Sequence, residues 1–102
     1  MLQLRPICEH CAVELAPDSV EARICSFECT FCRSCVEGLL SNVCPNCGGG
    51  FVPRPVRPSN NWKNDHFLGR YCASAERLHR PADLGSHRSL VERVYRVTPA
   101  SR

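Results

Sequence analysis

The stretch Cys25-Ser26-Phe27-Glu28-Cys29-Thr30-Phe31-Cys32-Arg33-Ser34-Cys35 places four cysteines within eleven residues. Two further close pairs flank it, so eight of the nine cysteines fall into four pairs. The pairs are Cys8/Cys11, Cys25/Cys29, Cys32/Cys35 and Cys44/Cys47. Eight thiolates are the ligand count of two four-cysteine sites, and such sites most often select zinc. The sequence therefore predicts two Zn²⁺ ions as structural cofactors.

Counting alone allows the four pairs to be joined in three ways. A knuckle, here the tight turn between two cysteines of a close pair, can bind the same ion as two cysteines at the first turn of a helix. This geometry favours an interleaved arrangement. Its first site is Cys8, Cys11, Cys32 and Cys35, and its second site is Cys25, Cys29, Cys44 and Cys47. Such a cross-brace ties residues distant in sequence to each other. A chain with almost no apolar core can hold a unique shape in this way.

The same cysteines could instead form disulfides or an iron–sulfur centre. An odd cysteine count, knuckle spacing and a start without an apolar h-region argue against a secreted disulfide scaffold. The bacterial ferredoxin run has three residues before its Cys-Pro, whereas eight separate Cys35 from Cys44-Pro45 here. Structural zinc is the interpretation that the spacing favours.

Local patterns predict a small α+β domain around these sites. Residues 20–24 are typical of a short strand, and residues 25–32 of a compact hairpin whose Phe27 and Phe31 can cover the metal sites. A short helix is expected over residues 34–40, weakened by Gly38.

The eight-cysteine string resembles the RING finger family over residues 8–47. Residues 29–36 are similar to its central motif, with Cys29 where a histidine is more usual, and residues 44–47 match its closing motif. The resemblance implies a RING-like, treble-clef cross-brace. Many RING domains recruit a ubiquitin-conjugating enzyme, but His10 and Gly48 stand where that role uses an apolar and a basic residue. Ligase activity is therefore an alternative that these positions disfavour, and we expect no enzyme.

The whole chain also resembles the DUF1272 family, small bacterial proteins of unknown function. These open Met-Leu-x-Leu-Arg-Pro, as residues 1–6 do, and continue with the core Ala-Arg-Ile-Cys-Ser-Phe-Glu-Cys-Thr-Phe-Cys, found here at residues 22–32. The resemblance implies a bacterial, zinc-binding, RING-like protein and brings no established activity with it.

Length and charge divide the chain into three predicted segments. They are a RING-like zinc domain (1–52), a Pro/Arg-rich linker (53–61) and a basic, partly helical extension (62–102). Residues 1–51 carry a net charge of −3 and residues 52–102 a net charge of +6. The two halves could attract each other, which competes with nucleic-acid binding by the extension.

A helix near residues 86–96, capped by Ser86, is expected in the extension. Its apolar face has to be covered, either by the zinc domain or by a homodimer partner. The face consists of His87, Leu90, Val91, Val94 and Tyr95. Candidate partner-binding residues are Trp62, Phe67, Arg70, Tyr71 and Arg77, although docking of the aromatic residues within the chain is the commoner outcome.

No shared motif combines a nucleophile, a base and an orienting acid, so we expect a non-enzymatic protein–protein interaction or assembly module with an unidentified protein partner. The alternative is a nucleic-acid-binding zinc protein that uses basic residues interleaved with aromatic ones. The basic residues are Arg54, Arg57, Lys63, Arg70, Arg77 and Arg80. No run has the length of a membrane span, which predicts a cytoplasmic protein without membrane contact, and Cys72 is expected to be a free thiol.

Overall fold

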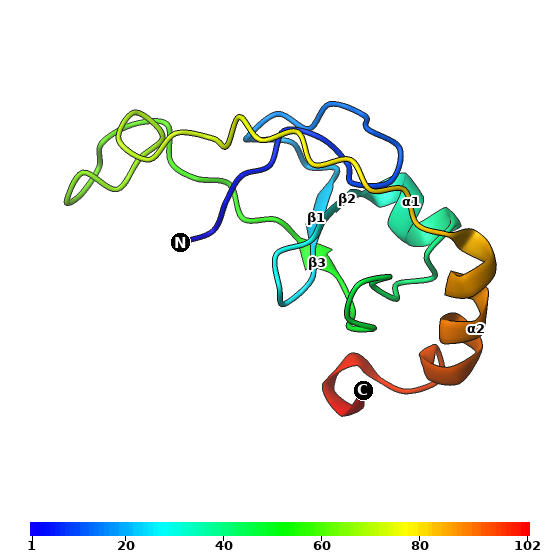
Figure 1. Cartoon of the computed structure of the whole chain (residues 1–102). Helices are drawn as coiled ribbons and strands as arrows, with labels where there is room; N and C mark the ends of the chain where they lie inside the picture. The colour runs from blue at the N-terminus through cyan, green and yellow to red at the C-terminus, as the bar shows by residue number, and fades with distance from the viewer.

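The computed structural model describes all 102 residues, which form short regular elements joined by long loops (Figure 1). In chain order the elements are β1 (Ala22–Ile24), β2 (Thr30–Cys32), α1 (Arg33–Gly38), β3 (Val52–Pro53), α2 (Leu84–Val94) and a final 3₁₀ turn, Pro99–Ser101. No helix combines the length and the apolar composition needed to cross a membrane.

A three-stranded antiparallel sheet has the order β2-β1-β3. In it, Ala22 pairs with Cys32 and Ile24 with Thr30, so β1 and β2 form a hairpin. Cys25 and Cys29 lie in the turn of this hairpin, where Glu28 adopts a positive φ of 64°. The hairpin predicted for residues 25–32 is therefore present, but its first arm begins before Cys25.

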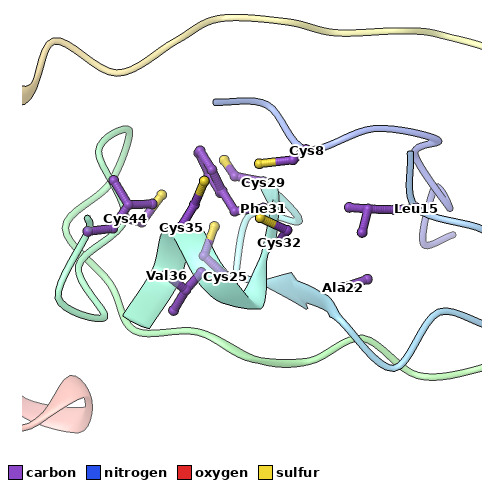
Figure 2. Close-up of a cluster of buried hydrophobic side chains, with 11 residues drawn as sticks. Cys8, Leu15, Ala22, Cys25, Cys29, Phe31, Cys32, Cys35, Val36 and Cys44 are labelled. Carbon is purple, nitrogen blue, oxygen red and sulfur yellow. The ribbon is translucent and has the colours of Figure 1, made fainter. Parts of the chain in front are cut away.

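The buried core is built largely from cysteine side chains, which gather around Phe31 beside α1 (Figure 2). Six of its eleven residues are cysteines, and Phe31 at its centre is 0% exposed. The Phe31 ring meets Phe51 edge-to-face, with ring centroids 5.4 Å apart. Cysteines therefore contribute more residues to this cluster than aliphatic side chains do.

Phe27 does not contribute to this core. Its side chain is 73% exposed, so the prediction that both phenylalanines of the hairpin cover the metal sites was wrong for Phe27. Phe27 lies in the turn between the strands, whereas Phe31 lies in β2, whose three residues are all buried. Alternation along the sequence places a side chain inside only where the backbone is extended and faces the core.

The extension first projects away as a loop and then runs back along the N-terminal segment of the chain (Figure 1). Three of the hydrogen bonds that hold it there are donated by its backbone. The backbone N–H groups of Ser74, Arg80 and Ala82 donate to Leu4 O (3.1 Å), Glu9 O (2.9 Å) and His10 Nδ1 (2.9 Å), respectively. The second half of the chain therefore covers part of the first half.

Helix α2 begins at Leu84, and Asp83 caps it by accepting hydrogen bonds from the backbone of Gly85 (3.0 Å) and Ser86 (3.4 Å). The predicted cap at Ser86 was wrong, because the Ser86 hydroxyl itself donates to Asp83. His87 is buried, and its Nε2 lies 3.0 Å from Leu40 O. The helix therefore packs by one face on the loop that follows α1.

The rest of the predicted apolar face is covered only in part. Leu90, Val91 and Val94 are half-buried, while Tyr95 follows the helix and is 47% exposed. Packing within the chain thus covers part of the stripe for which a dimer partner was an alternative.

Candidate metal centre

The first cysteine group joins a tight turn to the start of α1. The Sγ atoms of Cys8, Cys11, Cys32 and Cys35 all lie within 4.8 Å of one another. The turn after Cys8 is closed by a 3.0 Å bond from the Ala12 N–H to Cys8 O, and Ala12 takes a φ of 63°. Cys32 ends β2 and Cys35 lies in the first turn of α1, so a knuckle and a helix start face each other.

Sulfur spacing in this group fits a tetrahedral ion. Cys11 Sγ and Cys32 Sγ are 3.7 Å apart. A tetrahedron with Zn–S bonds of about 2.3 Å has S···S edges of about 3.8 Å, whereas the sulfurs of a disulfide are only about 2.05 Å apart. All nine cysteines are free of disulfides. The four sulfurs are therefore close enough together to hold one zinc ion.

A second group brings the hairpin turn to the last knuckle. The Sγ atoms of Cys25, Cys44 and Cys47 lie within 4.8 Å of one another. Cys29, the fourth predicted ligand, adjoins this group without meeting that spacing to all three, and its thiol interacts with that of Cys25. Three of the four predicted ligands are thus together, with the fourth at their edge.

Backbone N–H groups of the last knuckle point at its sulfurs. Asn46 N–H donates to Cys44 Sγ and Gly49 N–H to Cys47 Sγ, both at 3.4 Å. The turn is closed by a 2.7 Å bond from Gly48 N–H to Cys44 O, and Gly48 has a φ of 78°, a conformation that glycine adopts without strain. Donors aimed at sulfur stabilise thiolate, the form that binds metal.

Burial opposes ionisation of four of the eight thiols in the two groups. It raises the pKa of Cys35 and Cys44 strongly, and it also raises the pKa of Cys29 and Cys32. The pKa of Cys11 shifts the other way: burial opposes its ionisation too, but hydrogen bonds from the Val13 backbone and the neighbouring thiols together lower the pKa. A divalent cation reverses this balance, since a coordinating thiol is deprotonated outright. The donor set therefore suits a soft cation and, with four sulfurs, leaves no open coordination position.

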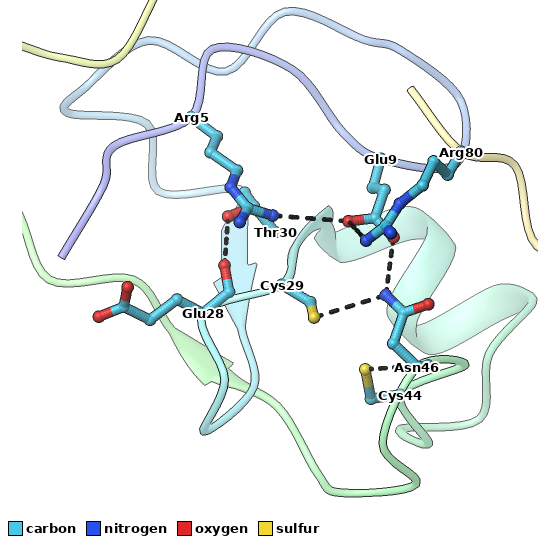
Figure 3. Close-up of polar contacts among 8 residues, drawn as sticks. All are labelled: Arg5, Glu9, Glu28, Cys29, Thr30, Cys44, Asn46 and Arg80. Carbon is cyan, nitrogen blue, oxygen red and sulfur yellow. Dashed lines mark hydrogen bonds and ion pairs between the residues drawn. The ribbon is translucent and has the colours of Figure 1, made fainter. Parts of the chain in front are cut away.

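The carboxylate of Glu9 is buried and lies beside Asn46 of the last knuckle (Figure 3). The Glu9 side chain is 2% exposed and accepts a 2.7 Å hydrogen bond from Asn46 Nδ2. Arg80 and Arg5 approach the same carboxylate at 3.4 Å and 3.6 Å. Sequence reasoning missed Glu9 and Asn46. The available signal was that each sits between the two cysteines of a knuckle, one as an acceptor and the other as a donor.

The candidate partner-binding residues do not form one cluster. Trp62 is 80% exposed, whereas Phe67 and Tyr71 are half-buried and line a cavity of about 290 Å³ beside the N-terminal residues. Arg70 lies over the Tyr71 ring, 5.8 Å from its centroid. Arg77 instead forms an ion pair with Glu14 of the first half.

Most of the predicted nucleic-acid-binding arginines contact the chain itself. Arg54 is buried, and it donates to Arg5 O and Ala16 O, both at 2.9 Å. Arg57 donates to Tyr71 O and Leu2 O, both at 2.7 Å. With the ion pairs of Arg77 and Arg80, four of the six predicted basic residues have intramolecular hydrogen-bond or ion-pair partners.

Comparison with known proteins identifies relatives without an assigned activity. An uncharacterised protein of Rhizobium meliloti (strain 1021) is 48% identical over 89 residues, which cover 87% of this chain and 99% of that protein. No solved structure matches the chain significantly. The family described as "Protein of unknown function (DUF1272)" matches residues 1–57, which contain both cysteine groups. The chain therefore belongs to the DUF1272 family.

Proposed function

We propose that this chain is a structural zinc protein that acts as a non-enzymatic protein–protein interaction or assembly module. Two Zn²⁺ ions, one in each cysteine group, would hold a RING-like, treble-clef cross-brace. The observation that carries the zinc assignment is the first group, whose four sulfurs lie within 4.8 Å of one another. Two four-cysteine sites are closed, so the ions support the fold and take no substrate.

The interaction role rests on exposed apolar side chains. Val20, Phe27 and Trp62 are 77%, 73% and 80% exposed. Large aromatic residues, tryptophan above all, are enriched at the centres of protein interfaces. Core packing does not account for these side chains, and each is accessible to a protein partner.

Metal content tests the zinc assignment. Protein purified without added metal should contain two zinc ions per chain by elemental analysis. Cys32→Ser should lower this number, whereas Cys72→Ser, which changes an exposed thiol outside both groups, should leave it at two. A folded chain that contains iron, or no metal, would contradict the assignment.

Partner capture tests the interaction role. A partner recovered by crosslinking from cells of the source organism should bind the zinc-loaded chain and be lost with Cys32→Ser, which breaks the fold. Trp62→Ala should weaken its binding without loss of zinc, because Trp62 lies far outside the cysteine groups in sequence and is exposed. Binding that persists in the unfolded variant would argue against a module with a defined surface.

Nucleic-acid binding receives less support than the interaction role. Four of the six predicted basic residues already form hydrogen bonds or ion pairs within the chain. Of the predicted set, Lys63 and Arg70 are left to contact phosphate. Two phosphate contacts would give only a shallow salt dependence. Steep, salt-sensitive binding of an oligonucleotide would reverse this preference.

Ligase activity is disfavoured by the surroundings of two positions. His10 and Gly48 stand where RING ligases use residues that contact the conjugating enzyme or assist transfer. His10 accepts a hydrogen bond from Ala82 N–H of the extension. A Cβ on Gly48 would lie 4.0 Å from Leu90 of α2. The chain's own second half thus faces both positions. Ubiquitin-like transfer with any of a panel of conjugating enzymes would contradict this view.

A further inference from the structure

Glu9 and Asn46 link the two cysteine groups directly (Figure 3). Glu9 lies between Cys8 and Cys11, and Asn46 lies between Cys44 and Cys47. The 2.7 Å bond from Asn46 Nδ2 to the Glu9 carboxylate therefore joins one knuckle to the other. Neither Glu9 nor Asn46 is a predicted metal ligand. Their hydrogen bond brings the two knuckles into contact.

Asn46 also contacts two sulfurs of the second group. Its Nδ2 lies 3.4 Å from Cys29 Sγ, and its backbone N–H lies 3.4 Å from Cys44 Sγ. Cys29 is the predicted ligand that stands at the edge of the group. The amide that Glu9 orients is thus the group that fixes the position of the Cys29 thiol.

A buried carboxylate beside two thiolate centres is costly unless it is compensated. Glu9 is 2% exposed, and Arg5 and Arg80 offset its charge at 3.6 Å and 3.4 Å. Replacing such buried ionic groups by apolar side chains is often neutral or stabilising, so stability alone does not account for them. The position of Glu9 is better explained by what it orients, which is the Asn46 amide.

We propose that Glu9 and Asn46 are positioning residues that couple the two metal centres, so that zinc at either centre raises the affinity of the other. The proposal rests on the zinc centres proposed above. An ion in the first group fixes the knuckle that carries Glu9, Glu9 orients Asn46, and Asn46 holds Cys29 and Cys44 for the second ion. Linkage makes the effect reciprocal, with the same coupling in either direction.

Native mass spectrometry of the full chain during zinc titration measures the coupling. At half saturation the wild-type chain should be mostly zinc-free or doubly loaded, with little one-zinc species. Asn46→Ala should let the one-zinc species accumulate and weaken the second step about tenfold to a hundredfold, the range of a hydrogen bond to a charged group. Asn60→Ala removes an exposed asparagine side chain without a sulfur contact and should behave as wild type.

Cobalt spectra provide a readout that a merely structural role would not change. With Co²⁺ in place of zinc, the thiolate charge-transfer band added by the second equivalent should be weaker in Asn46→Ala, because Cys29 is no longer held. Glu9→Gln keeps an acceptor for Asn46 but loses its charge, so its effect should fall between wild type and Asn46→Ala. Glu14→Gln removes an exposed ion pair with Arg77 and serves as its control.

The outcomes separate the coupling from the zinc assignment. A chain that binds no zinc contradicts the proposed function itself. A chain that fills two sites independently keeps the zinc function and overturns the coupling, as does an Asn46→Ala chain that weakens both steps equally with no added one-zinc species. If Asn46→Ala does not fold, Glu9→Gln repeats the zinc titration, since it keeps the size of Glu9 and an acceptor for Asn46 but removes the charge; no increase in its one-zinc species would overturn the coupling.

Discussion

Replacing Phe31 by alanine should destabilise the zinc-loaded chain by about 3–5 kcal/mol, whereas replacing Phe27 should cost no more than about 0.5 kcal/mol. Both residues belong to the β1–β2 hairpin, and both substitutions remove the same phenyl ring. Phe31 is 0% exposed at the centre of the cysteine-rich core, while Phe27 is 73% exposed in the turn. The pair therefore isolates burial as the cause of the difference.

The magnitude follows from three contributions. Full burial of a phenylalanine side chain is worth about 1.5–3 kcal/mol, and the cavity left by its removal adds to this cost. The edge-to-face contact with Phe51, at 5.4 Å between centroids, contributes about 0.5–1.5 kcal/mol more. Phe27 has only about a quarter of its surface removed from water, which scales the transfer contribution to about 0.5 kcal/mol.

The assay is urea unfolding followed by far-UV circular dichroism in a zinc buffer. The free zinc concentration has to be held constant, because an ion that binds only the folded chain adds a concentration-dependent stability. Trp62 fluorescence is a poor probe, since this residue is already 80% exposed in the folded chain. Equal decreases in the free energy of unfolding for the two variants, or a larger decrease for Phe27→Ala, would refute the placement of Phe31 in the core.

Three further predictions concern residues that follow the last knuckle. Arg54→Lys should destabilise the chain by about 1–3 kcal/mol in the same assay, because a lysine cannot reach both backbone carbonyls that the buried guanidinium now binds. Hydrogen bonds from Ser86 and Gly85 lower the pKa of Asp83 in the folded chain. The cap therefore stabilises the fold fully at pH values above the ordinary aspartate pKa of about 3.9. This stability is lost as the pH falls through the lowered pKa of the folded chain. Carboxyl-carbon NMR should find this lowered pKa, and Asp83→Asn should keep the cap without the titration; an ordinary or raised value would contradict the capping geometry. Gly50→Ala should loosen the last turn, since its Cβ would lie 2.8 Å from Pro99 Cγ, and unchanged amide-exchange protection of residues 99–101 would argue against that contact.

The spacing of nearby residues was enough to predict much of the fold. The cysteine pairs, the hairpin and the helix after Cys32 follow from rules that act over a few residues, and the structure contains the hairpin and a helix at Arg33–Gly38. The interleaved grouping also emerged for Cys8, Cys11, Cys32 and Cys35, because a knuckle and a helix start are each compact enough to present two sulfurs. Such geometry needs no knowledge of distant contacts.

The contacts between distant segments were not predictable in this way. Glu9 is an acidic residue in a loop, for which exposure is the usual expectation, and only the approach of Asn46, Arg5 and Arg80 makes its burial tolerable. The start of α2 was misplaced for a smaller reason. Two candidate caps, Asp83 and Ser86, stand three residues apart, and the choice between them depends on the path by which the extension reaches the helix.

The acidic first half and the basic second half of the chain attract each other where the extension packs on the first half. The first half carries −3 with neutral cysteines, and two closed four-thiolate zinc centres would add about −4, which leaves about −7 against the +6 of the second half. Arg77 and Arg80 of the extension already pair with Glu14 and Glu9 of the first half. Zinc loading should therefore strengthen the attraction that holds the extension in place, in addition to folding the residues on which it docks. The same basic residues that suggested nucleic-acid binding would then serve to make the attachment of the extension dependent on metal.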